Sequence, residues 1–314
     1  MNPPILDEFL NYLLSIKGKS KNTVYAYKTD LVIFFKYLKK RRSKSKNISY
    51  DDIDIENIDA DFIKSIKLSD MYGFISFLGL ERKNGNLSKA RKIAAIKSFY
   101  KYLHQKARLI DENVALELET PKISKRNPLY LSLEESRTLL NSIEGKFYER
   151  DLCIITLFLN CGMRLSELCG INISNIKDDT LTVIGKGDKE RTVYLNNSCL
   201  KALDLYLRKR QSSALRIKNN SFDALFISKN YCRIDKRNVE RIIEKYVKKA
   251  NLNSKLSPHK LRHTAATLMY KYGDVDIRSL QIILGHENVS TTQIYTHVDD
   301  EKLREAVSLN PLNT

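Results

Sequence analysis

The sequence contains no tryptophan, and residues that interrupt regular structure are scarce, with 11 glycines and 6 prolines in 314 residues. The five cysteines form no CxxC pair, so their spacing indicates neither a disulfide framework nor a cysteine-rich metal site. Cys153, Cys161 and Cys169 follow one another at intervals of eight in an apolar region. This placement is typical of small buried side chains in a reducing compartment.

The sequence also lacks an uncharged run long enough to cross a bilayer. Its first residues, MNPPILDEFL, have neither the basic segment nor the long apolar stretch of a secretory signal. We therefore expect a soluble, cytoplasmic protein that makes no membrane contact.

Positive charge is abundant: Lys and Arg number 54 against 37 Asp and Glu, a formal net charge of +17. The excess is spread along the chain, since residues 1–120 already hold 22 basic and 15 acidic side chains. Such a distribution indicates a polyanionic partner and fits two domains that close on one nucleic-acid duplex. Solubility or a membrane surface could use the same charge.

Apolar residues at helical spacing predict four helices in the N-terminal part, within residues 5–16, 20–40, 69–80 and 87–110. Basic residues of the last helix are expected outside its apolar stripe, where they would contact phosphates. A proline-containing, basic segment near residues 121–128 is typical of an extended linker that follows the DNA backbone. The candidate DNA contacts are Lys89, Arg91, Lys92, Lys97, Lys122, Lys125 and Arg126.

The C-terminal part is predicted to be mainly helical with one β-hairpin, in DDTLTVIGKGDKERTVYL. Lys186 lies in the hairpin turn between two glycines, where an ordinary surface lysine is equally plausible. Arg164 opens a helix after Gly162, and Glu167 three residues later is placed to orient it.

Four of the five histidines fall between residues 259 and 297. His259 and Arg262 are three apart in a predicted helix, so they share one face, and His286 and Tyr295 follow. A guanidinium fork and imidazole donors suit phosphate oxygens, and a phenol can attack phosphorus. Each residue alone is more often a packing residue, but their joint order predicts phosphoryl transfer through a covalent protein intermediate.

Zinc is the alternative for this region, because His259 and His263 have the i, i+4 spacing of zinc-binding helices. The intervening Glu of such helices is missing, and Arg262 would bring a cation beside the metal. No metal site is therefore expected.

These motifs resemble those of the tyrosine recombinases, also called lambda-type integrases, and within them most closely the Xer chromosome-dimer recombinases. The resemblance covers essentially the whole chain and is strongest from residue 130 onward. The residues that carry it are HKLRHTAAT at 259–267, LGHENVSTTQIYTHV at 284–298, CGMRLSEL at 161–168 and VIGKGDKERTVYL at 183–195.

The resemblance implies a mainly α fold with a small β-hairpin or sheet. An N-terminal helical SAM-like core-binding domain would cover residues 1–120, a linker 121–129, and the catalytic domain 130–314 with a C-terminal tail helix. It implies no metal and no cofactor. The catalytic residues it implies are Arg164, Lys186, His259, Arg262, His286 and the nucleophile Tyr295, with Glu167 supporting them.

The implied function is site-specific DNA recombination through a 3′-phosphotyrosine, resolving chromosome or plasmid dimers. The implied partners are a double-stranded recombination site, a homotetramer or a heterotetramer with a related recombinase, and a DNA translocase as activator. A phage or mobile-element integrase of the same chemistry, or a non-catalytic DNA-binding protein, are the alternatives. Either Lys186 or a histidine could protonate the leaving 5′-oxygen.

Replacing the predicted nucleophile separates a recombinase or integrase from a non-catalytic DNA-binding protein. Tyr295→Phe should bind DNA as the parent does but form no covalent adduct on a nicked duplex, because only the phenolic oxygen is removed. Gel analysis under denaturing conditions measures the adduct. Peptide mapping of the parent's adduct to Tyr270 or Tyr272 would contradict the assignment.

Overall fold

A computed structural model of the chain describes residues 2–43, 49–50, 52–122, 129–185, 189–273 and 275–285. The predicted DNA contacts Lys125 and Arg126 and the tail helix lie outside these residues. The chain divides into two compact units, Met1–Lys125 and Arg126–Thr314. The bounds 1–120, 121–129 and 130–314 stay a prediction. Across the described ranges, no helix is both long enough and apolar enough to span a membrane.

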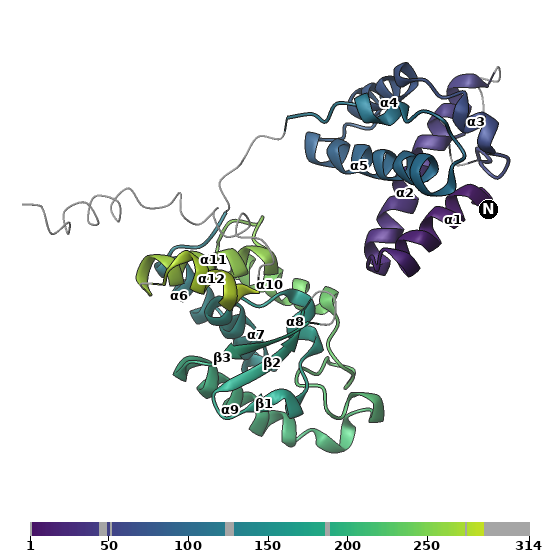
Figure 1. Cartoon of the computed structure of the whole chain (residues 1–314). Helices are drawn as coiled ribbons and strands as arrows, with labels where there is room; N and C mark the ends of the chain where they lie inside the picture. The colour runs from purple at the N-terminus through teal and green to yellow at the C-terminus, as the bar shows by residue number, and fades with distance from the viewer. Residues whose placement is uncertain are drawn as a thin grey trace, which may run out of the picture. The chain divides into compact units, whose positions relative to one another are not determined.

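The described part of the N-terminal unit consists of packed helices (Figure 1). Aromatic side chains lie in the core between them. The ring of Phe99 lies edge-on to Phe9 and to Phe35, with centroid distances of 5.2 and 5.7 Å. Such pairs add directional contacts to apolar burial. The helices are α1 (Pro4–Asn11), η1 (Tyr12–Ile16), α2 (Lys21–Arg42), α3 (Ala60–Lys64), α4 (Leu68–Leu80), α5 (Asn86–Tyr102), η2 (Leu103–Ala107) and η3 (Val114–Glu117).

The described part of this unit has five α-helices where the sequence pattern predicted four. The additional one, α3, is five residues long, too short to show a helical period. A side-chain cap begins it, since the Asp59 carboxylate accepts a hydrogen bond from the Phe62 N–H at 2.8 Å.

Lys92 was predicted to face outward on α5, but it does not. It is buried, at 5% exposure, and its ammonium lies 3.3 Å from a carboxylate oxygen of Asp30 on α2. Arg91 pairs with the same carboxylate at 2.5 Å while its side chain stays half exposed. The prediction that Lys92 lies outside was wrong because its partner is distant in sequence. Lys92 is a core ion-pair residue.

The C-terminal unit is built around α7 (Tyr148–Cys161), which is buried on nearly every side and packs against α9 and α11 (Figure 1). Gly162 ends α7 in the left-handed conformation, at φ +59°. A Cβ there would lie 2.8 Å from Leu284, so the turn also needs the space that glycine leaves. The other helices are α6 (Leu133–Asn141), α8 (Leu165–Gly170), η4 (Ile173–Asn175), α9 (Asn197–Gln211), η6 (Ala214–Arg216), η7 (Asn219–Ser221), α10 (Lys236–Lys249), α11 (Pro258–Tyr272) and α12 (Ile277–Leu284).

Three antiparallel strands form a sheet in the order β1-β2-β3: β1 (Ile176–Lys177), β2 (Thr180–Ile184) and β3 (Glu190–Tyr194). The hairpin of β2 and β3 was predicted, whereas β1 is too short to show alternation. Val183 pairs with Arg191, and Leu181 with Val193. Alternation puts Arg191 on the same face as the buried Val193. The predicted mainly helical fold with a small sheet is confirmed.

The buried position of Lys92 gives a stability prediction. Lys92→Met keeps the side-chain length but leaves the Asp30 carboxylate with only the half-exposed Arg91, and should cost up to about 3 kcal/mol of unfolding free energy. Lys101→Met, at an exposed position of the same helix, should change it by less than about 0.5 kcal/mol. Urea unfolding measures both. Unchanged stability with weakened DNA binding in Lys92→Met would show a phosphate contact instead.

Candidate active site

The centre of the site is the carboxylate of Glu167, whose side chain has no exposed surface. Arg164 is the residue before α8, and its backbone N–H donates to Glu167 Oε2 at 2.7 Å. The Arg164 guanidinium returns to the same carboxylate, with Nη1 donating to Oε1 at 2.7 Å. Glu167 therefore both caps the start of α8 and orients the side chain of Arg164.

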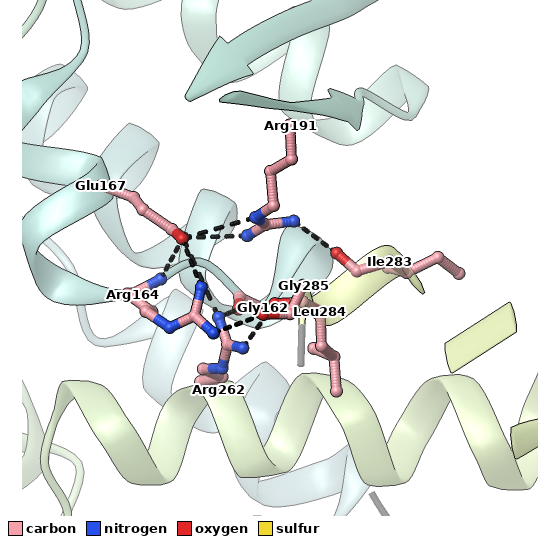
Figure 2. A network of polar contacts seen from close by, with 8 residues as sticks. All are labelled: Gly162, Arg164, Glu167, Arg191, Arg262, Ile283, Leu284 and Gly285. Atoms are coloured by element: carbon pink, nitrogen blue, oxygen red, sulfur yellow. Dashed lines mark hydrogen bonds and ion pairs between the residues drawn. The ribbon is translucent and has the colours of Figure 1, made fainter. Parts of the chain in front are cut away.

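A second guanidinium reaches this carboxylate from the sheet. Nη2 of Arg191 donates to Glu167 Oε2 at 2.9 Å, and Nε donates to Oε1 at 3.4 Å (Figure 2). The sequence motifs do not single out Arg191. The available signal was strand alternation. Arg191 stands two residues before Val193, so its charged side chain lies on the same interior face of the strand.

Arg262 approaches from α11, and its side chain is 4% exposed. Its Nη1 donates to the Gly162 carbonyl at 2.8 Å and its Nη2 to the Leu284 carbonyl at 2.6 Å. Nη1 lies 3.9 Å from Glu167 Oε2, an ion pair without a hydrogen bond. Arg164 Nη2 donates to the next carbonyl, that of Gly285, at 2.6 Å. The two guanidiniums thus meet at the end of α12 (Figure 2).

The arginines keep Glu167 ionised in spite of its burial. Burial alone would raise its pKa, but the hydrogen bonds and charge of Arg191 and the hydrogen bonds of Arg164 outweigh burial and lower the pKa. One negative charge is therefore surrounded by three positive ones. The cluster keeps a positive excess, which suits an anionic group.

His259 and His263 lie one turn apart on α11, with their Nε2 atoms 3.2 Å apart. Burial and then the charges of Arg262, Lys260 and Arg164 lower the pKa of His259. Burial and then His259 lower the pKa of His263 to about 4. Both rings are neutral near pH 7. Among the described side chains, no three His, Cys, Asp or Glu gather as a metal site requires.

The described part of the site brings Arg164, Glu167, Arg262 and His259 together from α8 and α11. The remaining predicted catalytic residues, Lys186, His286 and Tyr295, lie outside the described residues. Two of the described ranges stop directly before Lys186 and directly before His286. Gly185 N–H donates to the Lys189 carbonyl at 2.8 Å across the hairpin turn, and Gly285 directly precedes His286.

The sequence of each of the two units matches a known protein family. Residues 130–302 match the phage integrase family, and residues 6–107 match the phage integrase N-terminal SAM-like domain. The chain belongs to the phage integrase family and is a site-specific tyrosine recombinase, a DNA strand-exchange enzyme with a covalent tyrosine intermediate.

Within that family the chain is Xer-like. It is 56% identical over 313 residues to tyrosine recombinase XerC of Caldanaerobacter subterraneus subsp. tengcongensis, covering 99% of this chain and 88% of that protein. The crystal structure of XerA recombinase is similar, with 32% identity, TM-score 0.51, and coverage of 97% of this chain and 96% of that one. XerH bound to palindromic difH substrate shares the fold, with 24% identity, TM-score 0.71, and coverage of 91% and 79%.

The depressed pKa of His263 gives a pH prediction. The folded protein keeps this ring neutral down to about pH 4, whereas the unfolded chain takes up a proton near pH 6.5. The unfolded state therefore binds more protons between these values, and stability should fall as pH falls from about 6.5 to 4. His259 contributes in the same direction.

Urea unfolding at pH 7 and pH 5 measures this effect. His263→Gln should lose less stability between the two pH values than the parent, because glutamine does not titrate. His104→Gln, in the N-terminal unit, is the matched control and should behave as the parent does. An unchanged pH dependence in His263→Gln would contradict the prediction.

Proposed function

We propose that this recombinase acts at a specific site in double-stranded DNA and resolves chromosome or plasmid dimers, with Tyr295 as nucleophile. The observation that carries the proposal is the buried Glu167 surrounded by three guanidiniums, a preorganised cluster with surplus positive charge. The 56% identity to a XerC protein supports the Xer-type role. XerH, a protein of the same fold, was solved on difH DNA.

The arginines stabilise the negative charge that develops on the phosphate during the reaction. As the tyrosine oxygen attacks phosphorus, the non-bridging oxygens gain negative charge, and donors fixed in advance stabilise it without reorganising. The Arg164 side chain is 32% exposed, so a phosphate can reach it. The Arg262 side chain is 4% exposed and lies at the base of the site. The neutral His259 adds a hydrogen-bond donor.

The chemical step conserves the energy of the DNA bond. The Tyr295 hydroxyl loses its proton as its oxygen forms a bond to phosphorus, the bond from phosphorus to the 5′-oxygen breaks, and the 5′-oxygen takes a proton and leaves as a hydroxyl. The 5′-hydroxyl of a partner strand then attacks the 3′-phosphotyrosine and regenerates the tyrosine. His286 completes the set of phosphate donors, and Lys186 is the proton donor to the leaving oxygen.

The rest of the chain holds the duplex and assembles the reacting complex. The N-terminal domain, residues 1–120, clamps the DNA through Lys89, Arg91 and Lys97, and Lys122 in the linker follows the backbone. Four protomers, identical or paired with a related recombinase, join two sites, with a DNA translocase as activator. The reaction takes place in the cytoplasm, where the described free cysteines remain reduced.

Trapped adducts test the proposal and identify the substrate. Cells that express the parent protein are lysed in denaturant, covalent protein–DNA adducts are collected, and the attached DNA is sequenced. We expect one recurring site on the host chromosome or on plasmids, absent when Tyr295→Phe is expressed. Recovery of the site only within one mobile element would instead assign the protein to integration, and no adduct would contradict the proposal.

The role of Lys186 has a chemical test on a nicked duplex that carries the recovered site. Replacing the bridging 5′-oxygen by sulfur gives a leaving group of much lower pKa, which departs without protonation. Lys186→Ala should be badly impaired on ordinary DNA and recover on the sulfur-bridged strand. Arg262→Ala should recover little, because it lacks charge stabilisation. Equal responses of the two variants to sulfur would move the proton-donor role to His286 or Lys189.

A further inference from the structure

Arg191 is the one described guanidinium of the Glu167 cluster to which the proposed chemistry gives no role. Its side chain is 13% exposed and comes from β3, directly across from Val183 on β2. Its Nε and Nη2 donate to Glu167 and its Nη1 to the Ile283 carbonyl, so all three guanidinium nitrogens already face acceptors within the protein. Its function must therefore be sought in the side chains that it touches.

The acceptor capacity of Glu167 shows what Arg191 does there. A carboxylate offers about four acceptor positions. Two are taken by Arg164, through its backbone N–H and Nη1, and two by Arg191, through Nε and Nη2. No position is left for Arg262, whose Nη1 stays at 3.9 Å and donates to the Gly162 carbonyl instead.

Arg191 also fixes the end of α12. Its Nη1 donates to the Ile283 carbonyl, so one guanidinium joins the sheet, Glu167 and the last turn before His286. The fit is close, because a Cβ on Gly285 would lie 2.7 Å from Arg191 Cδ. Displacing Arg191 would therefore disturb both the carboxylate and the carbonyls of Leu284 and Gly285 that receive Arg262 and Arg164.

We propose that Arg191 is a positioning residue that occupies Glu167 so that this carboxylate, which already holds Arg164, does not also capture the guanidinium of Arg262. Without Arg191, two acceptor positions open on a buried carboxylate, and Nη1 of Arg262 lies only 3.9 Å from Glu167 Oε2. Arg262 turned onto Glu167 is withdrawn from the phosphate. The inference rests on the proposed role of Arg164 and Arg262 at the scissile phosphate.

Single-turnover cleavage of the nicked recovered site tests the proposal. Arg191→Met removes the charge and the donors but keeps much of the side-chain volume. The rate of covalent adduct formation should fall about 10–100-fold, as for other groups that orient catalytic side chains. DNA affinity, measured on the same protein, should stay within about twofold, because the remaining basic groups still bind phosphates. Arg208→Met, at an exposed position of α9, is the matched control and should cleave as the parent does.

Neutralising the carboxylate separates positioning from mere structural support. If Glu167, once relieved of Arg191, misdirects Arg262, then the double variant Arg191→Met with Glu167→Gln should cleave faster than Arg191→Met alone. A loss of packing alone predicts that the second change slows cleavage further or leaves it as it was. Arg191→Lys, which keeps the charge but cannot make the fork of bonds, should lie between the parent and Arg191→Met.

The thermal unfolding of each variant is measured together with its cleavage rate, to show whether the variant folds. If Arg191→Met does not fold, Arg191→Lys and the double variant carry the test, with the same expected order. Parental cleavage by a folded Arg191 variant, or equal losses of rate and affinity, would overturn the inference while leaving the proposed function intact. Failure of the parent itself to form an adduct would count against the proposed function instead.

Discussion

The C-terminal unit depends on keeping one carboxylate ionised in its interior. Glu167 has no exposed surface, and an unpaired buried carboxylate would cost several kcal/mol. The fold meets this cost with guanidiniums from the start of α8, from β3 and from α11. The same three side chains form a positive cluster. The interaction that stabilises the interior therefore also concentrates the positive charge that we propose receives a phosphate.

The turns that end α7 and α12 present backbone carbonyls to two of these arginines. Gly162 ends α7 with a positive φ, and its carbonyl receives Arg262. Gly285 does the same at the end of α12, and its carbonyl receives Arg164. Each guanidinium is thus held by a helix end as well as by the carboxylate. Donors fixed in this way need little reorganisation when charge develops on a phosphate.

The sequence allowed the helices, the hairpin and the pairing of Arg164 with Glu167 to be predicted, because these follow from local period, turn chemistry and short spacing. Arg191 could not be assigned, since its contacts are with Glu167 on α8 and Ile283 on α12, both distant from it in sequence. Lys92 was wrongly placed for the same kind of reason: its partner Asp30 lies on another helix. The roles of Lys186, His286 and Tyr295 follow from family resemblance and remain predictions.

The most direct test of this account is the rate of covalent adduct formation by Glu167→Asp on the nicked recombination site. Aspartate keeps the charge but withdraws it by one methylene, so it cannot hold Arg164 and Arg191 in their present positions. The account predicts a rate at least about tenfold lower, with DNA affinity preserved. A folded Glu167→Asp protein that cleaves at the parental rate would show that the arginines are positioned without this carboxylate, and would contradict the account.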